Sequence, residues 1–251
     1  MARWLPDGER IVRVSDEKGE EGLVVSRADG TGRPKHIRAR IGRPLDLAVA
    51  PAGRDRVALS NHSQQVLVVD LVSGKASTVE HSKYDRVGGL SWSPCGRYLA
   101  YGIAVSRTAS SIHVYDTRTK KVHEVTRPEF GDFSPAFDPT GRFLYFLSRR
   151  VFDPVYDNQY FDLGFPRAVQ PCLVPLAKDT PSPFVAATRK PRAPADNGES
   201  GKKELAKSTK IDWRGIADRV VAFPVPEKRY WNIAAGFDRV YLVHEPETGS
   251  L

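Results

Sequence analysis

A short stretch near the middle of the chain concentrates the side chains that could bind a ligand. It combines two adjacent arginines with acidic and aromatic residues: Arg149, Arg150, Asp153, Tyr156, Asp157, Tyr160 and Asp162. A guanidinium group can donate two parallel hydrogen bonds to one carboxylate, so the arginines could hold the carboxylates of a peptide. The alternative is that they are solvated residues at the end of a strand.

The three aspartates of this stretch do not have the spacing of a calcium loop. Three residues separate the first pair and four separate the second, whereas an EF-hand loop places its ligands at alternate positions and closes with a glutamate. The Phe, Tyr and Pro content favours a loop that packs on itself, as a plug or a bridge between repeats. The wall of a peptide channel or an interface is a second interpretation, and a metal site a third. We predict no metal and no cofactor.

Residues suited to nucleophilic catalysis are present without a recognisable arrangement. The histidines are His36, His62, His81, His113, His123 and His244, and serines are plentiful. The chain contains no Gly-x-Ser-x-Gly elbow. Because a catalytic triad is defined by geometry rather than composition, these residues alone do not indicate one. We predict no catalytic residue in this chain.

Repeated β-hairpins are the elements that must position these residues. A Pro-x-Gly turn recurs, and its prolines, Pro6, Pro51, Pro94 and Pro139, are separated by 45, 43 and 45 residues. Each turn precedes a short run of branched and aromatic residues, which is typical of a buried strand. A period of this length with four strand signals indicates the blade of a β-propeller. Trp4 and Trp92 occupy one position of the repeat, and we expect both to pack blade against blade.

We therefore predict an all-β fold, a β-propeller with about four four-stranded blades and part of a fifth. The expected blades cover residues 1–38, 44–81, 86–126, 133–226 and 230–251. In the fourth blade, residues 185–210 are predicted to be a disordered basic insert, and Asp218–Val225 a delayed outer strand. Because propellers close into a ring, we expect this chain to be a segment of a longer protein. A small propeller closed by its own termini is the alternative.

The net charge of +8 is partly local. Between Thr188 and Lys210, seven basic residues face three acidic ones, without aromatic residues. This composition favours a solvated loop over a nucleic-acid groove, so we expect no nucleic-acid partner. No apolar run is long enough to span a membrane, and the first residues lack the apolar core of a signal peptide, so we expect no membrane association. The two cysteines, Cys95 and Cys172, are predicted to be free thiols of a reducing compartment.

Several longer sequence motifs give the chain a specific resemblance to a known family. They include Val66–Leu71, Asp132–Pro139, Phe152–Asp157, Phe161–Pro166 and Ile216–Val225, in this order. Together they resemble the seven-bladed propeller of the tricorn protease family, over most of the chain and most specifically from Val66 to Val225.

The resemblance implies that the chain is a partial ring of such a propeller, in a cytoplasmic serine peptidase that trims oligopeptides and assembles as a homo-oligomer. In that family the propeller filters or channels oligopeptides toward a catalytic part, which this chain does not include. The resemblance therefore assigns enzymatic activity to the parent protein and transfers no catalytic residue. Two alternatives are a stand-alone propeller that acts as a protein-interaction scaffold without catalytic activity, and a periplasmic propeller of the TolB type.

Overall fold

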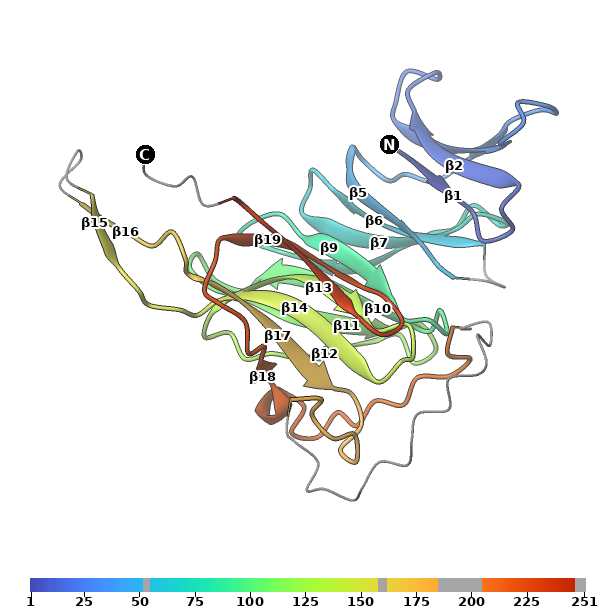
Figure 1. The fold of residues 1–251 in the computed structure, drawn as a ribbon. Helices are drawn as coiled ribbons and strands as arrows, with labels where there is room; N and C mark the ends of the chain where they lie inside the picture. Colours follow the sequence, from blue (N-terminus) through green and yellow to red (C-terminus); the bar gives the residue numbers. More distant parts are fainter. Residues whose placement is uncertain (52–54, 158–161, 185–204, 247–251) are drawn as a thin grey trace.

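The computed structural model describes residues 1–51, 55–157, 162–184 and 205–246. In these residues the regular elements are β-strands and one short 3-10 helix, Ala217–Arg219. The strands form antiparallel sheets that follow one another along the chain and stack face against face (Figure 1). No helix of the described residues is long and apolar enough to cross a membrane.

The first two sheets each contain four strands paired in chain order. The first consists of β1 (Ala2–Trp4), β2 (Arg10–Ser15), β3 (Gly22–Arg27) and β4 (Lys35–Ile37). The second consists of β5 (Pro44–Val49), β6 (Arg56–Asn61), β7 (Gln65–Asp70) and β8 (Ala76–His81). This up-and-down order is that of propeller blades.

The next eight strands join into one hydrogen-bonded sheet. One half contains β9 (Gly88–Trp92), β10 (Tyr98–Ala104), β11 (Ser110–Asp116) and β12 (Lys121–Glu124). The other contains β13 (Gly131–Phe137), β14 (Phe143–Arg149), β17 (Val169–Pro175) and β18 (Val221–Ala222). A single parallel pairing, Ser110 with Gly131, connects the halves. The remaining strands form two hairpins, β15 (Val155–Asp157) with β16 (Asp162–Gly164), and β19 (Tyr230–Ala235) with β20 (Val240–His244).

The repeated turns have the same backbone geometry in the three copies that the structure describes. Gly8, Gly96 and Gly141 have φ angles of 70°, 66° and 69°, a region that glycine enters without a steric penalty. Each donates its N–H to the carbonyl three residues earlier. The fourth copy, at Gly53, lies outside the described residues. The sequence repeat is therefore a repeat of structure as well.

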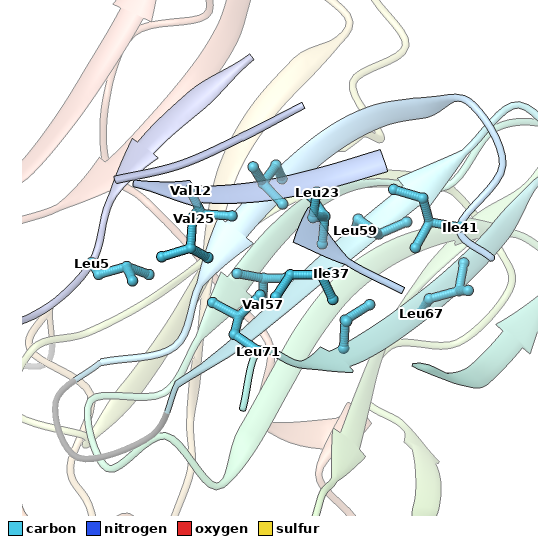
Figure 2. Close-up of a cluster of buried hydrophobic side chains, with 12 residues drawn as sticks. Leu5, Val12, Leu23, Val25, Ile37, Ile41, Val57, Leu59, Leu67 and Leu71 are labelled. Atoms are coloured by element: carbon cyan, nitrogen blue, oxygen red, sulfur yellow. The ribbon is translucent and has the colours of Figure 1, made fainter. Parts of the chain in front are cut away.

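The hydrophobic core lies between neighbouring sheets. Figure 2 shows the cluster between the first two sheets, where Val12, Val57 and Val69 are fully buried. Similar clusters continue along the stack, one of them around Trp92 and Tyr101 and the next around Leu144 and Phe146. Because neighbouring sheets bury their facing sides in these shared clusters, adjacent repeats stabilise one another.

Trp4 and Trp92 have different environments despite their equivalent positions in the repeat. Trp92 is 9% exposed and donates its indole N–H to the carbonyl of Ala48 in the neighbouring sheet, at 3.2 Å. Trp4 is 61% exposed. No neighbouring sheet covers its side of β1 in the described residues, so the expectation that Trp4 packs blade against blade is wrong.

The outer strand of the fourth repeat is only two residues long, shorter than the predicted Asp218–Val225. Residues just before it form the 3-10 turn, where the guanidinium of Arg219 donates to four carbonyls. These belong to Pro175, Leu176, Asp212 and Arg214, at 3.0, 3.2, 2.6 and 3.3 Å. The side chain fixes the turn and shortens the strand.

The predicted disordered insert, residues 185–210, is only partly described. Residues 185–204 lie outside the described residues. The remaining six pack against the fourth hairpin: Thr209 is buried, and the N–H of Ala206 donates to the carbonyl of Pro139 at 3.0 Å. The disorder expected for residues 185–210 stays a prediction.

Candidate peptide-binding mouth of the propeller

The first strands of successive sheets begin at one common end of the stack, and a pocket opens there. Strands β5, β9 and β13 lie side by side, and β14 ends where β13 begins. The pocket has a volume of about 520 Å³. Its lining comes from the starts of these strands and of β11, the loop before β9 and the ends of β6, β10 and β14: Leu45, Asp46, Ser60, Asp85, Arg86, Val87, Gly88, Gly89, Gly102, Ala104, Ser110, Asp132, Phe133, Ser134 and Arg149. We call this region the mouth.

A β-bulge shapes the mouth in each of these first strands. The pairing register shifts near Asp46 in β5, Gly89 in β9 and Ser134 in β13. Gly89 and Ser134 have positive φ angles of 68° and 50°, and Asp46 accepts a hydrogen bond from the next backbone N–H at 2.8 Å. Bulges redirect side chains and leave backbone groups unpaired, which suits a surface that contacts a ligand.

Arg149 and Arg150 lie at the mouth but have different roles. The side chain of Arg149 lies over Gly131, and its guanidinium carbon is 4.8 Å from the ring centroid of Phe133. It forms no ion pair with the described residues. Arg149 therefore presents unused hydrogen-bond donors to the pocket, as the peptide-binding interpretation requires.

The guanidinium of Arg150 is occupied by contacts within the protein. Its guanidinium donates to the hydroxyl of Ser148 at 2.7 Å and lies 3.3 Å from Asp132, whose side chain is 1% exposed. Ser148 in turn donates to the same carboxylate oxygen. The guanidinium carbon is also 4.8 Å from the ring of Phe130. Arg150 therefore neutralises a buried carboxylate and supports the wall of the mouth.

The other predicted site residues belong to a hairpin that projects from the stacked sheets (Figure 1). In β15–β16, Tyr156 pairs with Leu163, and the two side chains are 54% and 53% exposed. Asp153 is also exposed, Asp157 pairs with Asp162 through the backbone, and Tyr160 lies outside the described residues. Phe152 is 81% exposed. The rings of Phe152 and Phe165 lie 5.1 Å apart, so the stretch packs partly on itself, and its role as a plug or a bridge stays a prediction.

Most residues of the mouth were missed in the sequence, although a signal was present. Asp46, Gly89 and Ser134 each lie five residues before a turn proline, so they occupy one position of the repeat. Their types differ, and the shared feature is the backbone bulge rather than a side chain. Aligning the repeats on their prolines would have identified the position.

Chemistry beyond binding has no support in the described residues. No group of three or more His, Cys, Asp or Glu side chains converges there as a metal site would require. His113 lies in β11 rather than at the mouth, and its Nδ1 is 2.9 Å from Glu80, which also accepts a 2.6 Å hydrogen bond from Tyr101. Cys95 and Cys172 are free thiols, and burial raises the pKa of Cys172 to about 11, which keeps it protonated at neutral pH.

The repeated antiparallel sheets, their facing cores and the mouth at one end define a β-propeller. A crystal structure of the tricorn protease has the same fold, with a TM-score of 0.76, 22% identity and coverage of 90% of this chain and 21% of that one. Residues 1–251 match the family model of the tricorn protease second beta propeller domain. The chain belongs to this family, and the predicted all-β propeller fold is confirmed.

The relatives are considerably longer than this chain. Tricorn protease homolog 1 of Streptomyces coelicolor is 38% identical over 251 residues, which cover 98% of this chain and 23% of the relative. The tricorn protease homolog of Saccharolobus solfataricus is 34% identical over 246 residues, which cover 98% of this chain and 21% of the relative. The chain thus corresponds to less than a quarter of each of these two proteins.

Proposed function

We propose that this chain is the propeller part of a tricorn-like serine peptidase, and that its mouth admits oligopeptides to a catalytic part elsewhere in the polypeptide. The observation that carries the proposal is the match of nearly the whole chain to two proteins named as tricorn protease homologs. The mouth suits this role because its bulged strands offer unpaired backbone groups and Arg149 offers free donors. No side chain of this chain is assigned a catalytic role.

Three further properties belong to the same proposal. The parent protein acts in the cytoplasm, and its copies assemble into a homo-oligomer. The chain divides into blades at residues 1–38, 44–81, 86–126, 133–226 and 230–251, as the repeat spacing predicts. Subcellular fractionation and light scattering of the intact protein test the first two properties.

Narrowing the mouth tests the passage of peptides. Leu45 lines the pocket and is 36% exposed, so Leu45→Trp adds bulk to the opening without filling a core position. In the intact polypeptide we expect this variant to lower kcat/KM for a long peptide and to leave hydrolysis of a small chromogenic amide unchanged. Val72→Trp, at an exposed turn after β7, is the matched control. Equal rates for Leu45→Trp and the control on the long peptide would contradict the proposal.

A further inference from the structure

A second pocket adjoins the mouth on the side of the β10–β11 loop. Its volume is about 550 Å³, and it shares Asp85, Ala104, Ser110 and Arg149 with the first. Its other lining residues come from the loops before β9, between β10 and β11, and before β13: Tyr84, Ser106, Arg107, Thr108, Ala109, Glu129, Phe130 and Gly131. We call this pocket the side groove. Arg149 lies between it and the mouth.

The two pockets are lined by guanidinium groups that have no partners among the described residues. Arg86, Arg107 and Arg149 line them, and in the described part of the chain none of the three guanidinium groups has a hydrogen bond or an ion pair. Most of the carboxylates there are already occupied.

Most of these carboxylates accept hydrogen bonds from nearby groups, although Oδ2 of Asp132 is buried without a partner in the described residues. Asp46 accepts from the N–H groups of Leu47 and Leu90, at 2.8 and 3.3 Å, and Asp85 from that of Arg86 at 2.7 Å. Asp132 is paired with Arg150. Glu129 is left as the one carboxylate of this lining with no such bond in the described residues. The excess of unused guanidinium donors favours an anionic ligand.

Two residues of β13 contact the Arg149 side chain. Gly131 is its direct partner in the β13–β14 ladder, and an ideal Cβ at this glycine would lie 3.5 Å from the guanidinium Nη1. The guanidinium thus lies against Gly131 and over the ring of Phe133. A guanidinium held in this way loses little conformational entropy when it binds a carboxylate.

Two exposed aromatic side chains complete the side groove. Tyr84 is 51% and Phe130 38% exposed, and the ring of Phe130 is held by the guanidinium of Arg150. The floor between them consists of small residues such as Ala104, Ala109 and Ser110. A pocket lined by small residues and two exposed aromatic rings suits an extended peptide chain.

We propose that the side groove binds a carboxylate of an extended peptide through the guanidinium groups of Arg149 and Arg107. Tyr84 and Phe130 contact the adjoining residues of the peptide, and Arg150 is a positioning residue that holds Phe130. This inference rests on the proposed function, because the side groove holds one end of a peptide while the rest of the peptide enters the mouth. The carboxylate is either the C-terminal group or an acidic side chain.

Peptide binding by the intact polypeptide tests the inference, with its proposed catalytic serine blocked by a covalent serine-directed inhibitor. Three fluorescent peptides of one apolar sequence serve as probes: one with a free C-terminus, one amidated, and one amidated with an internal glutamate. We expect a carboxylate-bearing peptide to bind about tenfold more tightly than the plain amide. The free-acid and glutamate peptides distinguish the two sources of the carboxylate.

Substitutions then connect this preference to the residues. Arg149→Gln and Arg107→Gln should each reduce the preference for the carboxylate peptide toward one, with little effect on binding of the plain amide. Arg33→Gln is the control, because Arg33 is an exposed arginine outside both pockets. The Arg33→Gln variant should still bind the carboxylate peptide about tenfold more tightly than the plain amide.

Three results would overturn the inference: equal binding of all three peptides, no peptide binding, or a preference that survives both substitutions. Failure of the proposed function has a different signature, because an intact polypeptide without peptidase activity could still bind the carboxylate peptide through Arg149. Conversely, loss of the preference leaves the narrowing experiment on Leu45 unaffected.

Discussion

At the scale of single residues, Asp116 in β11 illustrates how charge stabilises this fold. Its side chain is 3% exposed and pairs with Arg97, whose Nε and Nη2 lie 2.9 and 2.5 Å from its two oxygens. The guanidinium, together with the N–H of Arg118, holds the pKa of Asp116 well below its ordinary value. A carboxylate whose pKa is lowered by folding stabilises the native state above its unfolded pKa, and this contribution is lost as the pH falls.

Asp116→Asn should therefore destabilise the protein in a pH-dependent way. At pH 7 we expect the free energy of unfolding to fall by about 2 kcal/mol, because Arg97 loses its buried partner. The difference from the unsubstituted protein should shrink as the pH falls below about 4, where the aspartate becomes protonated in the unfolded state and then in the folded state. Urea unfolding at several pH values measures both effects.

An exposed ion pair provides the control for this prediction. Glu245 pairs with Arg229 at 2.9 Å, and both side chains are more than half exposed. Because surface pairs contribute little to stability, Glu245→Gln should change unfolding far less than Asp116→Asn at pH 7. A pH-independent loss in Asp116→Asn would mean that packing, rather than charge, explains its effect.

Single residues were the hardest scale to predict from sequence. The spacing of Arg149 and Arg150 suggested two equivalent arginines, yet strand alternation turns the first toward the pockets and the second toward Asp132. Only the pairing with β13, which is distant in the sequence, decides which arginine remains free. For Tyr156, composition suggested a loop that packs on itself, whereas the side chain is exposed in the β15–β16 hairpin.

At the scale of elements, the close approach of β9 and β13 depends on one glycine. An ideal Cβ at Gly89 would lie 2.9 Å from the Cα of Ser134 and from the Cδ of Pro135. Backbone atoms cannot yield as a flexible side chain would. The φ angle of Gly89, 68°, is also unfavourable for any residue with a side chain. The two strands that form the mouth therefore meet only if this residue has no Cβ.

Gly89→Ala should destabilise the protein by about 2–4 kcal/mol, through steric overlap with β13 and the strained φ angle. Gly22→Ala is a matched control in β3, because a Cβ there meets no atom within 4 Å and the φ angle is not positive. It should have no effect or stabilise slightly. Thermal unfolding of the two variants makes the comparison, and equal midpoints would show that β9 and β13 do not pack as described.

The hairpins were predictable from sequence because their turns carry a local signal. Pro and Gly at fixed spacing specify each turn independently of distant contacts, and the structure has the same backbone at Gly8, Gly96 and Gly141. The outer strand of the fourth repeat was not predictable in the same way. Its length depends on Arg219 reaching carbonyls more than forty residues earlier, which no local pattern reveals.

At the scale of the whole molecule, the propeller is a repeated scaffold, and the inserted loops carry the features that are not repeated. Stacked sheets with facing cores fix the ends of β5, β9 and β13 at one mouth, whatever the sequence of the loops. Loops line the side groove, and the β15–β16 hairpin projects from the sheets (Figure 1). The proposed peptide-handling role therefore depends on loops that are carried by a repeated framework.

The central claim is that this propeller belongs to a larger serine peptidase. The most direct measurement captures the natural polypeptide from cells with an antibody against this chain, labels it with a fluorophosphonate probe and resolves it on a denaturing gel. We predict a fluorescent band far heavier than the 27.9 kDa of this chain. An unlabelled band at 27.9 kDa, or a heavy band that the probe does not label, would contradict the claim.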